Sequence, residues 1–125
     1  MTEPSVLELR GLSFRYATGR LALDNVTCAV SSGERLAVVG PSGAGKSTLL
    51  MHCNGLLPAP PLAREEEAHV FIHGLAVTKP RLRGIRRQVG FLFQDPDDQL
   101  FCPTVREDVA FGQIGRASCR ERVWR

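Results

Sequence analysis

The sequence predicts an α/β fold in which an antiparallel sheet comes before the first strand and helix of a parallel core. Apolar and polar residues alternate in two early segments, which is the pattern of half-buried strands. A short, continuously apolar run follows and leads through a glycine-rich loop into helix-forming residues. The chain has 125 residues, of which 43% are hydrophobic and 23% charged, and this is enough for one small domain.

The first two strands are expected around residues 7–14 and 23–30, where the alternation occurs. Turn-forming residues lie at 17–20 and 31–34, so each strand is expected to end in a turn. Residues 36–39 are all apolar and are interpreted as a strand buried on both faces of a parallel sheet.

The rest of the chain predicts two helices and two more strands. A helix is expected over residues 46–57, because the prolines that begin at Pro58 end it. Residues 70–72 and 89–93 are interpreted as strands, the second of them buried. A last helix is expected over residues 104–111, because its start has the Thr-x-x-Glu spacing of a capping box.

The charged residues predict solvated surface. The acidic run 65–67 is interpreted as a solvated loop, and the arginines within 81–87 as a solvated helix or turn. The formal net charge is +3, and the arginines of residues 116–125 account for this excess. Because the remainder of the chain is neutral, nucleic acid is not an expected partner.

A phosphate-binding loop is the strongest chemical signal in the sequence. Residues 40–47 match G-x-x-x-x-G-K-[ST] without a mismatch, between an expected strand and an expected helix. Glycines let successive backbone N–H groups and the helix N-terminus converge on phosphate oxygens. Lys46 is expected to contact the β- and γ-phosphates, Ser47 to complete a Mg²⁺ shell, and Thr48 to reach the α-phosphate region. The residues expected to bind nucleotide here are Gly40, Pro41, Ser42, Gly43, Ala44, Gly45, Lys46, Ser47 and Thr48.

Two further segments resemble a known family. Together with the loop, Leu-Ser-Phe-Arg-Tyr at 12–16 and the stretch from 90 to 101 look like the ATP-binding subunits of ABC transporters. The resemblance spans about residues 7–112. Residues 94–101 and 52–57 are most similar to cobalt/nickel and energy-coupling-factor (vitamin) importers. The implied fold is a partial P-loop NTPase core with the N-terminal antiparallel β-subdomain of an ABC ATPase.

The resemblance also implies roles for Tyr16 and Gln94. Tyr16 falls where the family has an aromatic residue that stacks on adenine, and a flat ring after a strand suits a purine. Gln94 resembles the glutamine of the family's Q-loop and, with Lys46, is expected to be a catalytic residue. Its neutral amide can bind Mg²⁺ together with Ser47, and a loop position lets it move with a partner subunit.

The implied function is that of an ATP-binding subunit that couples ATP binding and hydrolysis to import of a solute, a transition-metal ion or a vitamin. Its cofactors would be ATP and Mg²⁺, and its partners the transmembrane subunits and a second ATP-binding subunit. It would work at the cytoplasmic face of the membrane. The family's LSGGQ-type signature, Walker B Asp-Glu and switch histidine do not occur in this chain. The chain alone is therefore expected to bind nucleotide weakly and to hydrolyse it poorly or not at all.

Residues 1–112 are expected to form the N-terminal part of such a nucleotide-binding domain, and residues 113–125 to be a non-native read-through tail. Two alternatives stay open. One is a non-transport P-loop NTPase, such as a kinase or a GTPase, although the base-reading Asn-Lys-x-Asp of GTPases is missing and neither class explains Tyr16 together with residues 94–96. The other is a non-functional fragment.

Cysteine and histidine spacing predicts neither a metal site nor a disulfide. The four cysteines contain no C-x-x-C pair and are expected to be buried, reduced thiols, and the three histidines are expected to be structural or solvated. No run approaches the ~18 apolar residues of a membrane-spanning helix, and the N-terminus lacks the pattern of a signal peptide. The cysteines are Cys28, Cys53, Cys102 and Cys119, and the histidines are His52, His69 and His73.

Overall fold

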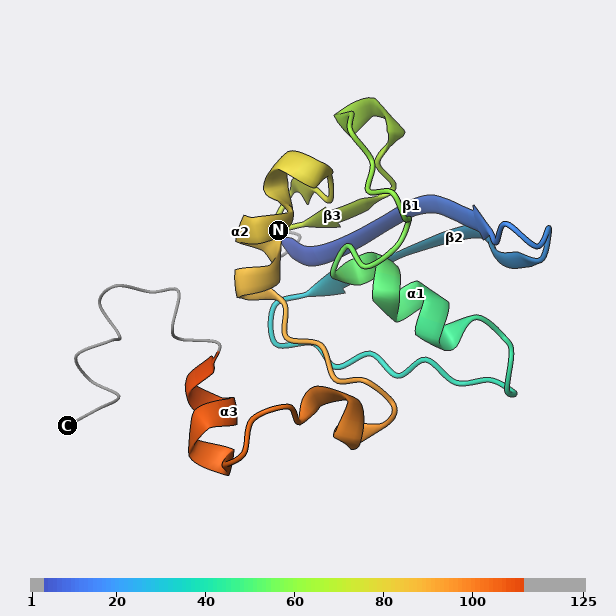
Figure 1. Cartoon of the computed structure of the whole chain (residues 1–125). Coiled ribbons are helices and arrows are strands. Elements are labelled where there is room, and N and C mark those ends of the chain that lie inside the picture. The colour runs from blue at the N-terminus through green and yellow to red at the C-terminus, as the bar shows by residue number, and fades with distance from the viewer. Residues whose placement is uncertain (1–3, 112–125) are drawn as a thin grey trace. The chain divides into compact units, whose positions relative to one another are not determined.

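The structure is a computed structural model that describes residues 4–111. The chain divides into two compact units, with the boundary between Gly90 and Phe91. Among the described residues, the first unit contains an antiparallel sheet and two α-helices, and the second contains one α-helix (Figure 1). No helix within residues 4–111 is long and apolar enough to cross a membrane.

The sheet of the first unit is antiparallel throughout and has the strand order β2-β1-β3-β4. The two long neighbouring strands seen in Figure 1 are the predicted pair, and the predicted strand at 70–72 is also confirmed. The strands are β1 (Ser5–Arg15), β2 (Leu21–Ser31), β3 (Val70–Ile72) and β4 (Leu75–Ala76).

A tight turn joins β1 to β2, as the sequence predicts. The Tyr16 N–H donates to the Arg20 carbonyl (2.9 Å), and the Gly19 N–H donates to the Tyr16 carbonyl (2.8 Å). Gly19 has φ 87°, a left-handed conformation that glycine adopts without a steric penalty. The turn therefore brings Tyr16 and Arg20 side by side at the end of the hairpin.

Helix α1 (Lys46–Cys53) follows the glycine-rich loop but ends four residues before the predicted end at residue 57. Gly55 has φ +74°, and the Asn54 side chain accepts a hydrogen bond from the Leu56 N–H (3.0 Å). The guanidinium of Arg86 donates to the Asn54 and Gly55 carbonyls (3.3 and 3.0 Å). A left-handed glycine just after the last turn is a common helix end, so Gly55 ends this helix before the prolines, and Arg86 binds carbonyls beyond that end.

The core of the first unit lies between the sheet and its helices, α1 and α2 (Leu82–Gln88). Alternate residues of β1 point into it, so Leu9 and Leu12 are 2% and 4% exposed. Helix α2 contributes Ile85, which is 1% exposed. The buried core residues are Leu9, Leu12, Leu23, Val70, Ile72, Val77, Leu82 and Ile85.

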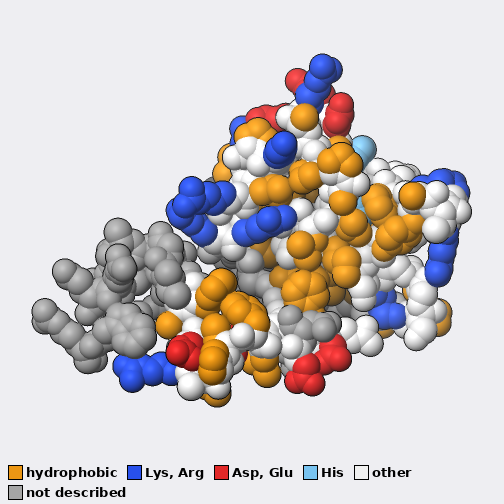
Figure 2. Space-filling model, in the orientation of Figure 1, with side chains coloured by type: hydrophobic (Ala, Val, Ile, Leu, Met, Phe, Trp, Pro, Cys, Tyr) orange, Lys and Arg blue, Asp and Glu red, His pale blue; other side chains and the backbone are white. Residues whose placement is uncertain are grey.

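The prediction of two further strands is wrong. Residues 36–39 and 89–93 form no strand, and Val39 and Leu92 are both 86% exposed. A central parallel strand needs hydrogen-bonded strands on both sides. Every strand pair within residues 4–111 is antiparallel, so the apolar runs find no such neighbours there. Figure 2 shows apolar side chains at the surface on the face in view.

The second unit contains helix α3 (Val105–Phe111), which has the predicted capping box. The Glu107 N–H donates to the Thr104 hydroxyl oxygen (3.3 Å), and the Thr104 N–H donates to the Glu107 carboxylate (3.2 Å). Upstream, the Gln99 side chain donates to the Phe91 carbonyl (3.0 Å). Within residues 4–111, short 3₁₀ turns occur at Glu65–Glu67 and Lys79–Arg81 in the first unit and at Pro96–Gln99 in the second.

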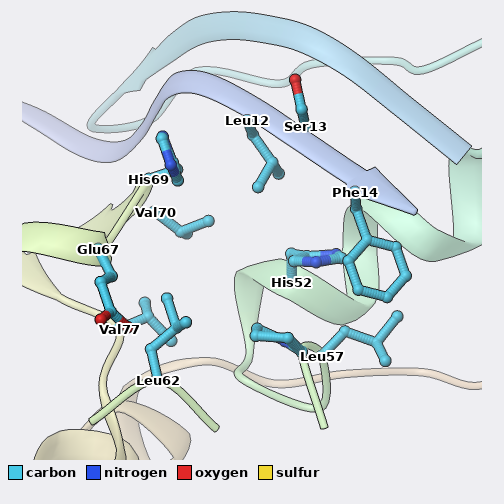
Figure 3. A pocket seen from close by; sticks show the side chains of 11 residues that line it. Leu12, Ser13, Phe14, His52, Leu57, Leu62, Glu67, His69, Val70 and Val77 are labelled. Carbon is cyan, nitrogen blue, oxygen red and sulfur yellow. The ribbon is translucent and has the colours of Figure 1, made fainter. Parts of the chain in front are cut away.

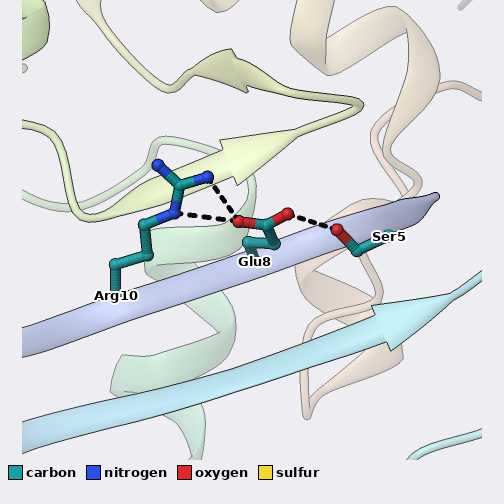
Figure 4. A network of polar contacts seen from close by, with 3 residues as sticks. All are labelled: Ser5, Glu8 and Arg10. Atoms are coloured by element: carbon teal, nitrogen blue, oxygen red, sulfur yellow. Dashed lines mark hydrogen bonds and ion pairs between the residues drawn. The ribbon is translucent and has the colours of Figure 1, made fainter. Parts of the chain in front are cut away.

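Exposed charges of the first unit form local pairs. The Arg10 guanidinium donates to Glu8 through Nε and Nη2 (2.8 and 2.6 Å), and the Ser5 hydroxyl donates to the other Glu8 oxygen (Figure 4). These contacts, that of Ser5 first, hold the pKa of the Glu8 carboxyl below its usual value. Arg10 also lies over the Phe71 ring of β3, with 4.2 Å between Cζ and the ring centroid. One of the arginines within 81–87, which the sequence predicts to be solvated, forms an ion pair: Arg81 pairs with Glu65 at 2.5 Å.

We expect Leu9→Ala to lower the free energy of unfolding by about 2–5 kcal/mol, because it removes a buried side chain that the core cannot replace. Leu21→Ala is the matched control. Leu21 lies on the neighbouring strand and is 44% exposed, so its truncation should cost no more than about 0.5 kcal/mol. Urea unfolding followed by circular dichroism measures both. Equal losses would contradict the position of the core.

Candidate nucleotide-binding site

The glycine-rich loop lies against the hairpin through Gly45, the residue that precedes α1. Gly45 has φ +99°, and a Cβ built on it would stand 2.5 Å from the Ala22 carbonyl oxygen of β2. A backbone atom cannot move aside as a side chain can, so only glycine fits here. Gly43 also has positive φ (82°) and carries a turn in which the Ala44 N–H donates to the Pro41 carbonyl (3.2 Å).

The N-terminus of α1 is open to a ligand. The hydrogen bond from the Leu49 N–H to the Gly45 carbonyl (2.9 Å) begins the helix, and no side chain caps it. The N–H groups of the first turn therefore have no partner within the helix, and no acidic residue lies in that turn. Free N–H groups and the positive end of the helix dipole favour an anion such as a phosphate.

Lys46 lies at the loop itself. Its ammonium donates to the Gly40 carbonyl (2.7 Å) and the Pro41 carbonyl (2.8 Å). Because an ammonium has three donors, one remains for a ligand. The contacts place positive charge at the loop, and no acidic residue within 4–111 pairs with it, which fits a site for a nucleoside triphosphate.

Arg20 is a second cation at the loop, and sequence reasoning missed it. Its guanidinium donates to the Gly43 carbonyl (2.9 Å). Arg20 belongs to the β1–β2 turn, and only the folded hairpin brings it to the loop. No motif in the sequence could have indicated this contact.

Tyr16 lies beside the first turn of α1, in the same unit as the loop. Its hydroxyl is hydrogen bonded to the Thr48 hydroxyl, with 2.7 Å between the oxygens. Its ring packs edge-on against Phe14, with 5.0 Å between centroids, and the residue is 38% exposed. The ring is thus held by two contacts and still reaches solvent, as a stacking platform must. Adenine stacking by Tyr16 stays a prediction.

His52 is a structural residue of α1. It is 3% exposed, and its Nδ1 donates to the Thr48 carbonyl (2.8 Å). Burial lowers the pKa of His52, and the bond to Thr48 opposes this effect only in part. Its ring packs edge-on against Phe14, with 4.7 Å between centroids, as Figure 3 shows from close by. Of the other histidines, His69 donates through Nδ1 to the Arg10 carbonyl (2.7 Å).

A cavity of about 260 Å³ lies beside this cluster and not at the phosphate loop. Its walls come from β1, α1, β3 and the segment between α1 and β3 (Figure 3). Most of the lining is apolar, and none of residues 40–48 takes part. The lining residues are Leu12, Ser13, Phe14, His52, Leu57, Pro58, Leu62, Glu67, His69, Val70 and Val77.

The cysteines of the described chain are free thiols. Cys28, Cys53 and Cys102 are partly exposed, which corrects the expectation that they are buried. Burial raises the pKa of Cys53 to about 11, with a smaller contribution from Cys28, so this thiol is unreactive near neutral pH. Within residues 4–111, no group of three or more His, Cys, Asp or Glu residues has metal-binding geometry. Cys119 lies outside the described residues.

Gln94 belongs to the second unit and is exposed. The expectation that it ends a buried strand is wrong, because residues 89–93 form no strand. Its role toward Mg²⁺ and the nucleotide stays a prediction. The expected tail at 113–125 lies outside the described residues.

Comparison with known proteins decides the family. The sequence model of the ABC transporter family matches residues 23–124, which include the phosphate loop. The chain belongs to the ABC transporter family.

The curated relatives of this ABC family member are ATP-binding proteins. An energy-coupling factor transporter ATP-binding protein of Methanothermobacter thermautotrophicus is 54% identical over 111 residues, which cover 87% of this chain and 34% of that protein. An ABC transporter ATP-binding protein of Streptomyces coelicolor is 51% identical over 109 residues, which cover 87% of this chain and 40% of that protein. The chain thus spans less than half the length of these relatives.

A solved structure confirms the fold class. The structure of cbiO1 from Clostridium perfringens, described as part of the ABC transporter complex cbiONQ, matches with a TM-score of 0.76 and 28% identity. The match covers 97% of this chain and 47% of that one. The antiparallel sheet with its helices therefore has the arrangement of part of an ABC ATPase.

We expect Gly45→Ala to lower both the free energy of unfolding, by about 2 kcal/mol or more, and the affinity for ATP, because the new methyl group would displace the loop from β2. Gly33→Ala is the control, since Gly33 also has positive φ (+75°) but nothing within 4 Å of its built Cβ. That variant should cost about 1 kcal/mol from backbone strain and leave ATP affinity unchanged. Urea unfolding and calorimetric titration with MgATP measure the two effects. A Gly45 variant that behaves like the Gly33 variant would refute the close packing.

Proposed function

We propose that the chain is part of the ATP-binding subunit of an ABC importer, which couples ATP binding and hydrolysis to solute import. The observation that carries this proposal is the loop itself. Residues 40–45 lead into an uncapped helix N-terminus, with the Lys46 ammonium at the loop carbonyls. A triphosphate matches this combination of N–H donors and positive charge.

Each part of the nucleotide has a group suited to it. Lys46 and the loop N–H groups would bind the β- and γ-phosphates, and Thr48 would reach the α-phosphate region. Tyr16 is the candidate for the adenine, because its ring is partly exposed beside the same helix turn. Arg20 adds positive charge at the loop.

The chain also has a residue suited to Mg²⁺, the ion that neutralises charge developing on the phosphates when it is bound. The Ser47 side chain is exposed in the first turn of α1, and its hydroxyl has no hydrogen-bond partner among residues 4–111. A hydroxyl oxygen is a ligand that Mg²⁺ accepts. We propose Ser47 as one ligand and the Gln94 amide oxygen as another.

The solute is proposed from similarity. The resemblance of residues 52–57 and 94–101 to cobalt/nickel and energy-coupling-factor (vitamin) importers supports import of a transition-metal ion or a vitamin. Relatives named as energy-coupling factor transporter proteins agree with this resemblance. The same similarity supports transmembrane subunits and a second ATP-binding subunit as partners, at the cytoplasmic face of a membrane. Within the chain, we propose residues 1–112 as part of the nucleotide-binding domain and 113–125 as non-native.

We expect Lys46→Ala to weaken MgATP binding about 10- to 100-fold, because charge-assisted hydrogen bonds to phosphate are the strong ones. Lys79→Ala is the control, since Lys79 is exposed in a 3₁₀ turn remote in sequence from the loop. Calorimetric titration of both variants with MgATP gives the comparison. Unchanged affinity in the Lys46 variant would overturn the phosphate-loop assignment.

In the full-length subunit, which carries the motifs that this chain lacks, we expect Gln94→Ala to leave ATP affinity within about twofold of the parent but to lower transport-coupled hydrolysis at least about tenfold. A group that acts mainly in the closed, reactive arrangement changes turnover and not ground-state affinity. Gln88→Ala, which changes an exposed glutamine at the end of α2, is the control. ATP affinity and ATPase rate are measured with and without transmembrane subunits. A loss of affinity as large as that of the Lys46 variant would show that Gln94 is a primary nucleotide ligand.

A further inference from the structure

Four side chains from β1, the turn after it and α1 form a closed circuit next to the phosphate loop. The Tyr16 hydroxyl bonds to the Thr48 hydroxyl (2.7 Å), and His52 Nδ1 donates to the Thr48 carbonyl (2.8 Å). The His52 ring packs edge-on against Phe14 (4.7 Å between centroids), and Phe14 packs edge-on against Tyr16 (5.0 Å). The circuit therefore returns to Tyr16, the candidate platform for the base.

The members of this circuit differ in burial. His52 and Thr48 are 3% and 7% exposed, whereas Tyr16 is 38% exposed. The inner part of the circuit is therefore held by the surrounding atoms, and only its outer member is open to a ligand. His52 contacts Tyr16 only through Phe14 and Thr48, so it does not belong to the nucleotide surface itself.

The cavity explains why the His52 ring matters for Phe14. Both residues line the space of about 260 Å³ seen in Figure 3. A side chain that faces a cavity lacks packing partners on that side. The rings of His52 and Tyr16 contact Phe14 edge-on, and Phe14 also packs against the hydrophobic core. Loss of the His52 ring would enlarge the space into which Phe14 can turn.

We propose that His52 is a positioning residue that fixes the Tyr16 ring relative to the phosphate loop, so that binding of the purine base depends on a histidine that does not touch it. The proposal rests on the proposed function. Without the His52 ring, Phe14 gains rotational freedom and the edge contact to Tyr16 weakens. The Tyr16 ring must then be ordered when the base binds, and this cost lowers affinity for the base but not for the phosphates.

The test separates the base from the phosphates. Affinities for MgATP and for magnesium tripolyphosphate, which has no base, are measured by calorimetry on the parent and its variants. Tyr16→Ala is the reference for complete loss of stacking on the base and should weaken ATP binding about tenfold. Tripolyphosphate affinity should change less than about twofold in that variant, because the proposed phosphate contacts of Lys46 and the loop N–H groups do not involve Tyr16.

Two substitutions of His52 separate its ring from its hydrogen bond. His52→Asn keeps a donor near the Thr48 carbonyl but removes the ring, and it should weaken ATP binding about three- to tenfold with tripolyphosphate affinity unchanged. His52→Phe keeps the ring and should retain ATP affinity within about twofold, since the Thr48 carbonyl is also a helix acceptor. His69→Asn is the control, because His69 lines the same cavity but makes no ring contact with Phe14, and it should leave both affinities unchanged.

The outcomes are distinguishable. Equal loss of ATP and tripolyphosphate affinity in a His52 variant that keeps its circular dichroism spectrum would overturn the positioning role, as would unchanged ATP affinity in His52→Asn. If the Asn variant does not fold, Phe14→Leu replaces it, and the same selective loss of ATP affinity is expected. Unchanged ATP affinity in Tyr16→Ala would overturn base stacking and the inference with it. Failure of the proposed function itself would appear separately, as unchanged ATP affinity in Lys46→Ala.

Discussion

The close packing of Gly45 against β2 is the constraint on which the candidate site depends. The loop backbone comes so near the Ala22 carbonyl that no side chain fits between them. This contact holds the N-terminus of α1 against the hairpin, and the turn of that hairpin carries Tyr16 and Arg20. The glycine-rich loop, Tyr16 and Arg20 thus meet within one unit because one glycine allows two backbones to touch.

Polar contacts then order what the close packing brings together. The Lys46 ammonium and the Arg20 guanidinium donate to carbonyls of the loop, at Gly40, Pro41 and Gly43. The loop carbonyls are thereby occupied by cations, while the N–H groups of the first helical turn have no partner within the helix. Donors and positive charge remain for an anion, which is the electrostatic requirement of a phosphate site.

The family assignment and the geometry contribute different information. Membership of the ABC transporter family follows from the match over residues 23–124 and accounts for a nucleotide site, but similarity alone gives no role to Arg20 or His52. Their contacts with Gly43 and with Thr48 and Phe14 appear only in the folded unit. Residues that act through others leave no motif, because their effect depends on packing and not on spacing along the chain.

The sequence by itself determined the glycine-rich loop before α1, the β1–β2 hairpin and the capped helix at 104–111, because glycine conformation, strand alternation and capping depend on residues close together in the chain. Tertiary structure decided the remainder. The guanidinium of Arg86, from α2, binds the Asn54 and Gly55 carbonyls that follow α1. The apolar runs 36–39 and 89–93 form no strand, because a strand exists only when neighbouring strands supply its hydrogen bonds, and sequence pattern cannot reveal whether those neighbours are in place.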